Sequence, residues 1–424
     1  MLCPLLFLDI VTSLNLFVEG FAHWLGSLTL IDFLVIFWPL LLFDFLRSVG
    51  KSIFLLGYEA WQRLTRPEFR GDFAPQLSLI IPAHNEEKII ARSVESALET
   101  DYEKKEIIVV DDGSKDRTYE LALPYARKGL IKLLRRDVAS GSKAGALNYG
   151  LLFASGEIIV TVDADTVLER ESLKEIAKPL SDEDISAVSG NVRVLRGENG
   201  ADNLLVKLQA YEYVISLELG RRFNSAIGTL LMISGAFGAF WRKNVTSIGE
   251  YDRDTITEDF DMTVKMRKLG KRLFFSEDAV CWTFAPETWR DWRRQRTRWT
   301  RGQIETLWKH ANIFGMKGFD LRLIATVYDM LFMDIILLFG RFAWLLLVLF
   351  FYQPTIVYVM IVSILMYLLI EFIAIGTAII LSRRKSDLGS ILLVPIVVLF
   401  YRPYHSLVRF RAYVDWALGR ESQW

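Results

Sequence analysis

The chain has 424 residues, enough for one large domain or two, and its 50 lysines and arginines balance its 50 aspartates and glutamates. The balanced charge identifies no partner and argues against nucleic acid, so only local clusters of charge are informative. The two cysteines, Cys3 and Cys281, are too few for a disulfide framework and are typical of a reducing compartment.

The amino-terminal region, residues 1–60, predicts one or two membrane spans. Residues 26–46 form an apolar run long enough to cross a hydrocarbon layer of roughly 30 Å, whereas residues 4–21 are interrupted by polar positions. Lysine and arginine first occur at Arg47, so the basic region of a signal peptide is not expected. The basic residues that follow place the next region in the cytoplasm by the positive-inside rule. The alternative is a buried core helix with an amphipathic arm.

Residues 70–310 are predicted to form an α/β domain, because short apolar runs alternate with segments of helical periodicity. This alternation predicts a largely parallel sheet covered on both faces. Ligands of open α/β sheets bind beyond the carboxyl ends of strands, and polar motifs follow three of the predicted strands. The predicted strands are residues 77–83, 106–112, 131–136 and 157–165, and the predicted helices are residues 86–99, 116–128 and 143–153.

Two pairs of acidic residues stand at these strand ends. Asp163 and Asp165 point the same way in an extended segment, and paired carboxylates suit a hard divalent cation such as Mg²⁺. The alternative for this pair is a solvated loop. Asp111 and Asp112 precede a Gly-Ser turn, and they suit either a helix cap or hydrogen bonds from a nucleobase or ribose.

Two further motifs begin helices. The sequence SGSKAGALNYG lacks the spacing of an NTPase phosphate loop, but Lys143 at the start of a helix suits a diphosphate, or else is a surface lysine beside a cap. In TITEDFD, the acidic residues Glu258, Asp259 and Asp261 are either caps or include one general base.

Residues 287–308 form a strip rich in arginine and tryptophan. One face of the predicted helix suits phosphate oxygens and a stacked sugar, and the opposite face suits anionic headgroups or an acidic protein surface. The first face carries Trp292, Gln295, Arg298, Trp299 and Gly302, and the second carries Arg290, Arg294 and Arg301.

Residues 320–424 predict two or three further spans and a basic interfacial tail. Residues 330–352 and 355–381 are each long enough to span, whereas residues 391–401 are short and suit a span, a re-entrant piece or an interfacial helix. The ionisable residues Asp329, Asp334 and Glu371 either line a cavity or pair between helices.

The ordered motifs IIPAHNEE, VVDDGS, SKAGALN, VDADT, ISGAFGAF, TITEDFD and QRTRW resemble the membrane-bound family 2 glycosyltransferases of GT-A fold. Within them, the resemblance is to the processive synthases of cellulose, chitin, hyaluronan and poly-N-acetylglucosamine. SGAFGAF and CWTFAPET are most similar to the poly-β-1,6-N-acetylglucosamine synthases. The resemblance implies a GT-A-type nucleotide-diphospho-sugar transferase domain of α/β class, cytoplasmic and flanked by transmembrane helices, in an integral cell membrane protein.

The resemblance also implies roles for individual residues. Asp163 and Asp165 hold Mg²⁺ or Mn²⁺, with Asp165 as the direct ligand. Asp259, beside Glu258, is the base that deprotonates the acceptor hydroxyl. The nucleotide-sugar is bound by His84, Asn85, Glu86, Asp112, Lys143 and Asp163. The acceptor end is shaped by Ser234, Gly235, Phe237 and Trp299, and the motif of Gln295, Arg298 and Trp299 places Arg298 on the leaving diphosphate.

The expected function is that of an inverting, metal-dependent hexosyltransferase. It takes a sugar from a nucleotide-diphospho-sugar, UDP-GlcNAc or UDP-glucose, adds it to a growing β-linked polysaccharide and helps move the polymer across the bilayer. The partners are the donor, a polysaccharide or glycan acceptor and the lipid bilayer, but no nucleic acid. The alternatives are a non-processive transferase acting on a lipid-linked acceptor and a catalytically silent scaffold of an export complex.

Overall fold

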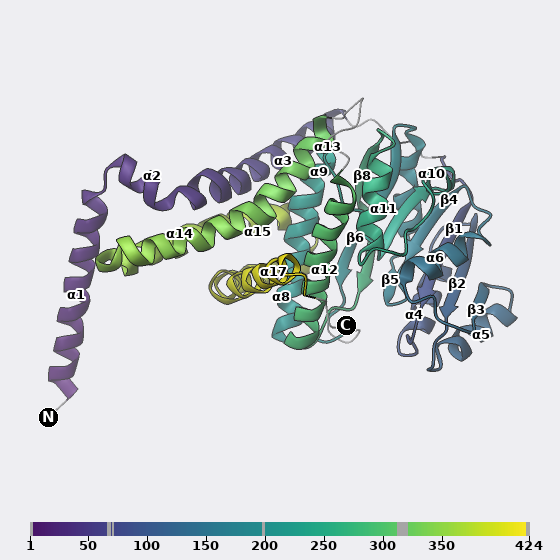
Figure 1. Cartoon of the computed structure of the whole chain (residues 1–424), viewed down its shortest axis with the longest axis horizontal. Helices are drawn as coiled ribbons and strands as arrows, with labels where there is room; N and C mark the ends of the chain where they lie inside the picture. Colours follow the sequence, from purple (N-terminus) through teal and green to yellow (C-terminus); the bar gives the residue numbers. More distant parts are fainter. Residues whose placement is uncertain (1–2, 66–68, 70–71, 197–199, 312–320, 421–424) are drawn as a thin grey trace.

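The computed structural model describes residues 3–65, 69, 72–196, 200–311 and 321–420. Figure 1 shows an α/β unit built around one sheet, with long helices from both ends of the chain extending to one side of it. The amino-terminal helix α1 (Cys3–Ser27) lies farthest from the sheet.

Eight strands form one sheet in the order β3-β2-β1-β4-β7-β6-β8-β5. Their bounds are β1 (Leu77–Ala83), β2 (Lys105–Asp112), β3 (Lys132–Arg136), β4 (Ile158–Val162), β5 (Thr166–Leu168), β6 (Ile185–Val194), β7 (Phe237–Trp241) and β8 (Arg272–Thr283). The four strands predicted between residues 77 and 165 are present. Strands β1 and β4 are buried at every position, as expected of central strands covered on both faces.

The sheet is mixed, which corrects the prediction of a largely parallel one. Strands β3, β2, β1 and β4 are parallel neighbours, and β6 is parallel to β8. Strand β7 runs antiparallel to both β4 and β6, and the short strand β5 runs antiparallel to β8. The prediction failed because antiparallel strands can be joined without a crossover helix. The alternation of strands and helices in the sequence therefore does not indicate where antiparallel strands occur.

Helices cover the sheet and connect it to the membrane segments. Within the α/β unit the α-helices are α4 (Ile90–Glu99), α5 (Thr118–Arg127), α6 (Lys143–Leu151), α7 (Ser172–Ala177), α8 (Leu204–Val214), α9 (Arg222–Ala226), α10 (Arg242–Ser247), α11 (Glu258–Arg267) and α12 (Trp289–Lys309). A 3₁₀ turn, η2 (Lys178–Ser181), follows α7, and a π-helix, η4 (Ile215–Arg221), continues α8.

The flanking helices are largely apolar. At the amino end, α1 is followed by α2 (Leu30–Trp38), η1 (Pro39–Phe45) and α3 (Leu46–Thr65). At the carboxyl end stand α13 (Leu321–Leu331), η6 (Phe332–Ile336), α14 (Leu337–Phe351), η7 (Gln353–Thr355), α15 (Ile356–Ser382), η8 (Lys385–Leu393), α16 (Val394–Ile396), η9 (Val397–Tyr401) and α17 (Arg402–Ala417). Among the described residues, helices 356–382 and 385–417 are long and apolar enough to cross a membrane.

A third candidate span is bent. Helices 12–27 and 30–62 meet at 105°, and together they are long and apolar enough to cross. The bend falls where Thr29 begins a new helix: its hydroxyl accepts from the Asp32 backbone N–H, and the Asp32 carboxylate accepts from that of Thr29. This reciprocal cap stabilises a helix start. The apolar run 26–46 therefore begins at a helix break.

The carboxyl-terminal tail is continuous with the short apolar run before it, as part of one helical stretch over residues 385–417. Pro395 lies in the first turn of α16, where a backbone N–H is not needed, so it does not interrupt the helix.

Among the ionisable residues noted in the sequence, Glu371 is buried and accepts from Tyr211 and Arg402. The side chains of Asp329 and Asp334 lie outside the described part of the structure.

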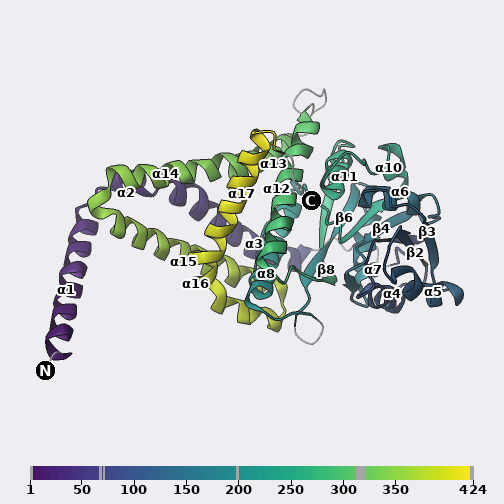
Figure 2. The same ribbon diagram turned by 60° about the horizontal axis from the view of Figure 1, so that its bottom comes forward.

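The α/β unit and the apolar helices are packed together. Arg193 at the end of β6 donates to Asp387 in η8 over 3.0 Å, and Arg222 in α9 lies 3.5 Å from Glu59 in α3. Helices α12 and α17 lie side by side (Figure 2), and the rings of Trp308 and Trp416 are 6.2 Å apart. The strip of arginine and tryptophan thus joins the sheet to the apolar helices.

Candidate active site

Side chains from four separate segments meet beyond the carboxyl end of β4. The Lys143 ammonium, at the start of α6, contacts the carboxylate of Asp163, which directly follows β4. Its Nζ also lies 3.2 Å from Oε1 of Glu258 in α11 and 3.3 Å from the backbone oxygen of Gly235. Asp165, two residues after Asp163, accepts from the hydroxyl of Thr283 over 3.3 Å. The structure therefore brings together motifs that are up to 140 residues apart, from Lys143 to Thr283.

Three carboxylates near the end of β4 carry raised pKa values. Burial, and then repulsion from Asp165 and Asp163, raises the pKa of Glu86 to about 7. Burial raises the pKa of Asp163 to about 6 against the lowering effect of Lys143, and burial also raises that of Asp165. Mutual repulsion of this kind is relieved when a cation lies between the carboxylates.

The donor set fits a divalent cation that also binds substrate oxygens. Mg²⁺ in proteins is commonly held by one or two carboxylates together with substrate phosphates and water. Asp163 and Asp165 supply such a pair. Among the residues that the structure describes, no group of three or more histidine, cysteine, aspartate or glutamate side chains forms a closed metal site. The pair therefore needs oxygens from a ligand to complete a coordination shell.

Asp259, in the first turn of α11, is a half-buried carboxylate held by backbone amides. Its Oδ1 accepts from Phe260 over 2.8 Å and its Oδ2 from Gly235 over 3.2 Å. Burial, followed by repulsion from Glu258, raises the pKa of Asp259 to about 6, although Lys143 lowers it. A carboxylate with that pKa is ionised at neutral pH and is more basic than a free aspartate, which suits a general base.

The predicted nucleotide-binding residues gather at the ends of β1 and β2. The Asp112 carboxylate accepts from the backbone N–H and hydroxyl of Ser140, and His84 Nδ1 lies 2.8 Å from the backbone oxygen of Asp112. Asn85 has a positive φ of 60°, and its backbone N–H donates to the Ser114 hydroxyl. These contacts fix the loops around the end of the sheet. Asp112 thus positions the loop before α6.

Residues near the acceptor end lie between β7 and the Asp259 cluster. Ser234 donates its backbone N–H to the Ser189 hydroxyl over 3.3 Å, and Phe237, the first residue of β7, is fully buried. A Cβ atom on Gly235 would lie 3.0 Å from Lys143 Nζ and 3.1 Å from Asp259 Oδ2. Glycine therefore lets this backbone approach both charged groups.

Helix α12 divides the predicted ligand face into exposed and buried parts. Arg298 and Trp299 are exposed, and Gln295 has a buried Oε1 without a hydrogen-bond partner in the described part of the chain. Trp292 is fully buried, and its Nε1 donates to the Tyr401 hydroxyl over 3.0 Å. Trp292 is thus unavailable to a sugar, which corrects the helical-wheel prediction. That prediction assumed a solvent-facing helix, whereas this turn packs on α17 and its neighbours.

The opposite face of α12 is also only partly as predicted. Arg290 and Arg294 are exposed and suit headgroups or an acidic surface. Arg301 is mostly covered and lies 3.6 Å from Glu305, so it is engaged within its own helix.

Gly302, on the predicted ligand face, faces Thr257, and a Cβ atom there would come within 2.4 Å of the threonine Cγ2. Arg298, one turn earlier, therefore shares the face that meets the start of α11.

Two arginines near the site, the half-buried Arg221 and the buried Arg296, were missed from the sequence. Arg221 in η4 donates to the Ser189 hydroxyl over 3.0 Å. Desolvation lowers the pKa of Arg221, and the negative charge of Asp259 partly opposes this effect. Arg296 pairs with Glu212 over 2.8 Å, and its guanidinium lies 4.3 Å from the ring centre of Trp299. Arg296 stands at a spacer position of the QRTRW motif, so only the packing reveals its role. No pattern in the sequence marks Arg221.

Comparisons with known proteins agree with this arrangement. Residues 78–246 match the sequence model of the family Glycosyl transferase family 2. The chain is 31% identical over 262 residues to a poly-beta-1,6-N-acetyl-D-glucosamine synthase of Staphylococcus aureus (strain COL), covering 61% of this chain and 62% of that protein. It is 28% identical over 277 residues to the synthase of the same description from Staphylococcus epidermidis, covering 64% and 65%. The match spans less than two thirds of these relatives.

A solved structure has the same fold. It is a mannosyltransferase from Pyrobaculum calidifontis in complex with GDP-Man and Mn²⁺, with a TM-score of 0.59 and 20% identity. The likeness covers 91% of this chain and all of that one. At this identity the comparison concerns the fold alone.

Proposed function

Because the chain contains a family 2 glycosyltransferase domain of GT-A fold, related to the poly-β-1,6-N-acetylglucosamine synthases, we propose that it transfers N-acetylglucosamine from UDP-GlcNAc to a growing β-linked polysaccharide. The observation that carries this proposal is the meeting of Lys143, Asp163 and Glu258 beside Asp259. These residues would form an anionic site for a cation-bound diphosphate next to a base. UDP-glucose is the second donor to be tested.

The donor end of the site would bind a diphosphate. A divalent cation, Mg²⁺ or Mn²⁺, held by Asp163 and Asp165, would offset the charge that develops on the departing diphosphate. Arg298 would contact the same oxygens from α12, and its guanidinium suits phosphate. Asp112, His84 and the loop at Asn85 would hold the nucleoside. The Mn²⁺ in the mannosyltransferase complex supports a divalent cation in this fold.

The transfer itself needs no nucleophilic side chain. The acceptor oxygen attacks the anomeric carbon, the bond from that carbon to the diphosphate oxygen breaks, and the nucleoside diphosphate leaves with the electron pair. Asp259 takes the proton of the acceptor hydroxyl. Attack on the face opposite the leaving group inverts the anomeric carbon, so an α-linked donor gives a β-linkage. The exposed ring of Trp299 would stack under the acceptor sugar and orient it.

The apolar helices support a membrane role for the chain. We divide it into membrane segments in residues 1–60, a cytoplasmic catalytic domain in residues 70–310, and membrane segments with a basic tail in residues 320–424. Arginine and lysine after the first apolar run favour the cytoplasmic side for the catalytic domain. Trp299 lies on the helix that packs against α17, so a polymer that leaves the acceptor site meets the membrane helices at once. This favours a processive synthase that passes its product outward.

The test uses membranes that contain the full chain, incubated with radiolabelled UDP-GlcNAc, UDP-glucose or GDP-mannose and with Mg²⁺ or Mn²⁺. Products are sized and digested with linkage-specific hydrolases. We expect a polymer from UDP-GlcNAc, no product from Asp259→Asn, and full activity from Asp278→Asn, a matched control at an exposed position of β8. A lipid product that carries one added sugar would contradict a processive mechanism. Absence of sugar transfer from all three donors would contradict the proposed transferase activity.

A further inference from the structure

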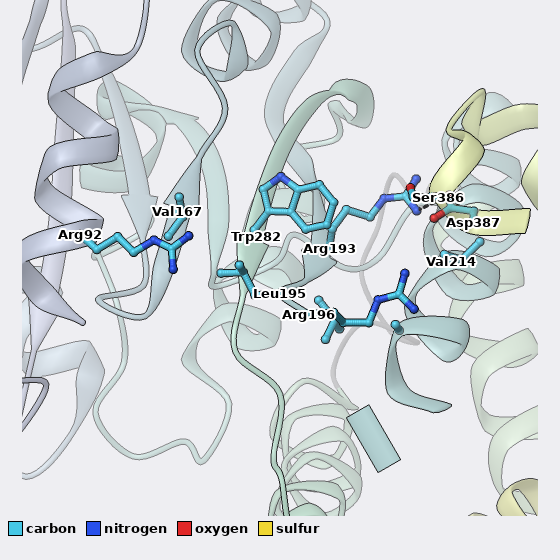
Figure 3. Close-up of a pocket in the computed structure, with 11 residues that line it drawn as sticks. Arg92, Val167, Arg193, Leu195, Arg196, Val214, Trp282, Ser386 and Asp387 are labelled. Atoms are coloured by element: carbon cyan, nitrogen blue, oxygen red, sulfur yellow. Dashed lines mark hydrogen bonds and ion pairs between the residues drawn. The ribbon is translucent and has the colours of Figure 1, made fainter. Parts of the chain in front are cut away.

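A second cavity, apart from the carboxylate cluster, lies at the junction of the sheet edge with the membrane-side helices. Its volume is about 340 Å³, at the small end of the range of roughly 300–1,000 Å³ for ligand pockets. It is bordered by α4, β5, the ends of β6 and β8, α8 and η8 (Figure 3). Asp163, Asp165 and Asp259 are not among its lining residues, so it is distinct from the candidate active site.

The lining of this cavity is positively charged. Arg92, Arg193 and Arg196 line it against a single acid, Asp387, which leaves three positive charges and one negative. Arg193 is buried and pairs with Asp387 and Glu218, yet its Nε has no hydrogen-bond partner among the residues that the structure describes. Arg196 forms no ion pair with any residue that the structure describes. An anion in the cavity would meet Arg196 and the Nε of Arg193, both near the carboxyl end of β6.

The cavity also offers a flat apolar surface. Figure 3 shows the Trp282 indole at its centre, between Arg92 from α4 and the Arg193–Asp387 pair, with Leu195 below. The Trp282 ring is held in place because its Nε1 donates to Glu169 Oε1 over 2.9 Å. A fixed indole beside guanidinium groups is suited to a ligand that carries both a planar ring and a negative charge.

We propose that this cavity binds a nucleoside phosphate of mononucleotide size, with its phosphate at Arg196 and Arg193 and its base against Trp282. The proposal goes beyond the transfer reaction and does not depend on it. The site also has a short connection to the catalytic carboxylates. Trp282 precedes Thr283, whose hydroxyl donates to Asp165 over 3.3 Å, and Val167, which pairs with Trp282 between β5 and β8, lies two residues after Asp165. A ligand stacked on Trp282 would thus contact the strands β5 and β8, which position Asp165.

The test measures binding to the purified full chain in detergent without turnover. The probe is AMP carrying an N-methylanthraniloyl fluorophore, and an excess of UDP with Mg²⁺ occupies the donor site. We expect a saturable rise in fluorescence anisotropy that UDP does not abolish. Arg196→Glu should weaken the affinity for the probe at least tenfold, and Trp282→Leu should do the same. Arg272→Glu, at the exposed opposite end of the same strand β8, should leave it unchanged.

Two results would overturn the proposal: wild-type protein without UDP-resistant binding, and Arg196→Glu protein that binds the probe as tightly as wild type. Arg196 has no ion-pair partner within the described residues, so its substitution should change ligand binding without destabilising the fold. As a control for folding, each variant must keep the wild-type affinity for UDP. Asp259→Asn separates the two functions, since it should lose sugar transfer and retain the probe. Failure of the probe to bind would leave the transfer reaction untouched.

Discussion

The backbone N–H of Gly235 donates to Oδ2 of Asp259 over 3.2 Å, and this bond fixes the orientation of the carboxylate. The same glycine accepts from Lys143 through its backbone oxygen over 3.3 Å. Gly235, two residues before β7, thus contacts both the proposed base and the lysine that neutralises Asp163. The arrangement requires a residue without a side chain, because a Cβ would sit between the two charges.

Gly235→Ala should therefore reduce transfer strongly with little loss of fold. The new Cβ would lie 3.0 Å from Lys143 Nζ and 3.1 Å from Asp259 Oδ2, so both groups must shift by a few tenths of an ångström. Small displacements of reacting groups are costly, and we expect a loss of kcat of roughly ten- to a hundredfold. The measurement is incorporation of labelled sugar, with UDP affinity as a check on the donor site.

The matched control is Gly57→Ala in α3, where a Cβ would meet no atom within 4 Å. Alanine in a helix interior is favoured over glycine by roughly 0.5–1 kcal/mol, so this variant should be fully active and at least as stable. Equal activity of the two variants would contradict the role assigned to Gly235.

The pH dependence of transfer should show an acid limb near pH 6. Burial and the neighbouring Glu258 raise the pKa of Asp259 to about 6, and only the ionised form accepts a proton. Activity should therefore be complete above pH 7 and fall about tenfold per unit well below pH 6. Glu258→Gln removes a repelling charge, which should lower the pKa of Asp259 and move the acid limb to lower pH. An unmoved or raised limb in Glu258→Gln would exclude Asp259 as the titrating base.

The sequence predicted the parts of this site that local patterns carry. The carboxyl ends of β1 and β2 were correctly placed, because buried parallel strands are continuous apolar runs, whereas β4 ends at Val162, three residues before its predicted end at Asp165. Asp163 could be assigned to a strand end, but its partner Lys143 could not, since twenty residues and a helix separate them. The burial of Trp292 was missed for a related reason: a helical wheel orders the faces of a helix but does not say which face meets protein.

Removal of divalent cations should abolish transfer. Asp163 and Asp165 alone do not complete a coordination shell, so the cation should exchange readily and EDTA should strip it. We expect activity to return on addition of Mg²⁺ or Mn²⁺ to the wild type but not to Asp165→Asn, which should lose at least a hundredfold. Asparagine can still accept from Thr283, so the fold should persist. Full activity of the wild type in EDTA would contradict a metal-dependent mechanism.

The pair of the buried Arg296 and the half-buried Glu212 should stabilise the junction of α8 with α12. Arg296 is 3% exposed and stacks near Trp299, and the Glu212 carboxylate also accepts from Tyr401. Removing Arg296 leaves the partly covered Glu212 charge less compensated, so Arg296→Met should cost about 1–3 kcal/mol. The double variant Arg296→Met/Glu212→Leu should recover most of this loss. The measurement is the apparent Tm in detergent, and an equal loss in the single and double variants would contradict the pairing.

The close approach of α12 to α11 should set the distance between Arg298 and Asp259. Gly302 permits the approach, because a Cβ there would come within 2.4 Å of Thr257 Cγ2 and 2.6 Å of its hydroxyl. Gly302→Ala must therefore push α12 away from the start of α11, and Arg298 lies one turn from the contact on the same face. We expect a loss of activity of roughly tenfold or more, seen in kcat rather than in the KM for donor, if Arg298 acts mainly on the leaving group in the transition state.

Thr257→Ala in the Gly302→Ala background should restore part of the activity, because it removes the two threonine atoms nearest to the new Cβ. Gly220→Ala is the matched control: it is also a helical glycine, and its nearest atom would be 4.0 Å away. A variant of Gly302 with wild-type kcat would show that Arg298 acts independently of this contact. Recovery in the double variant would instead show that the spacing of the two helices, more than the identity of residue 302, governs the position of Arg298.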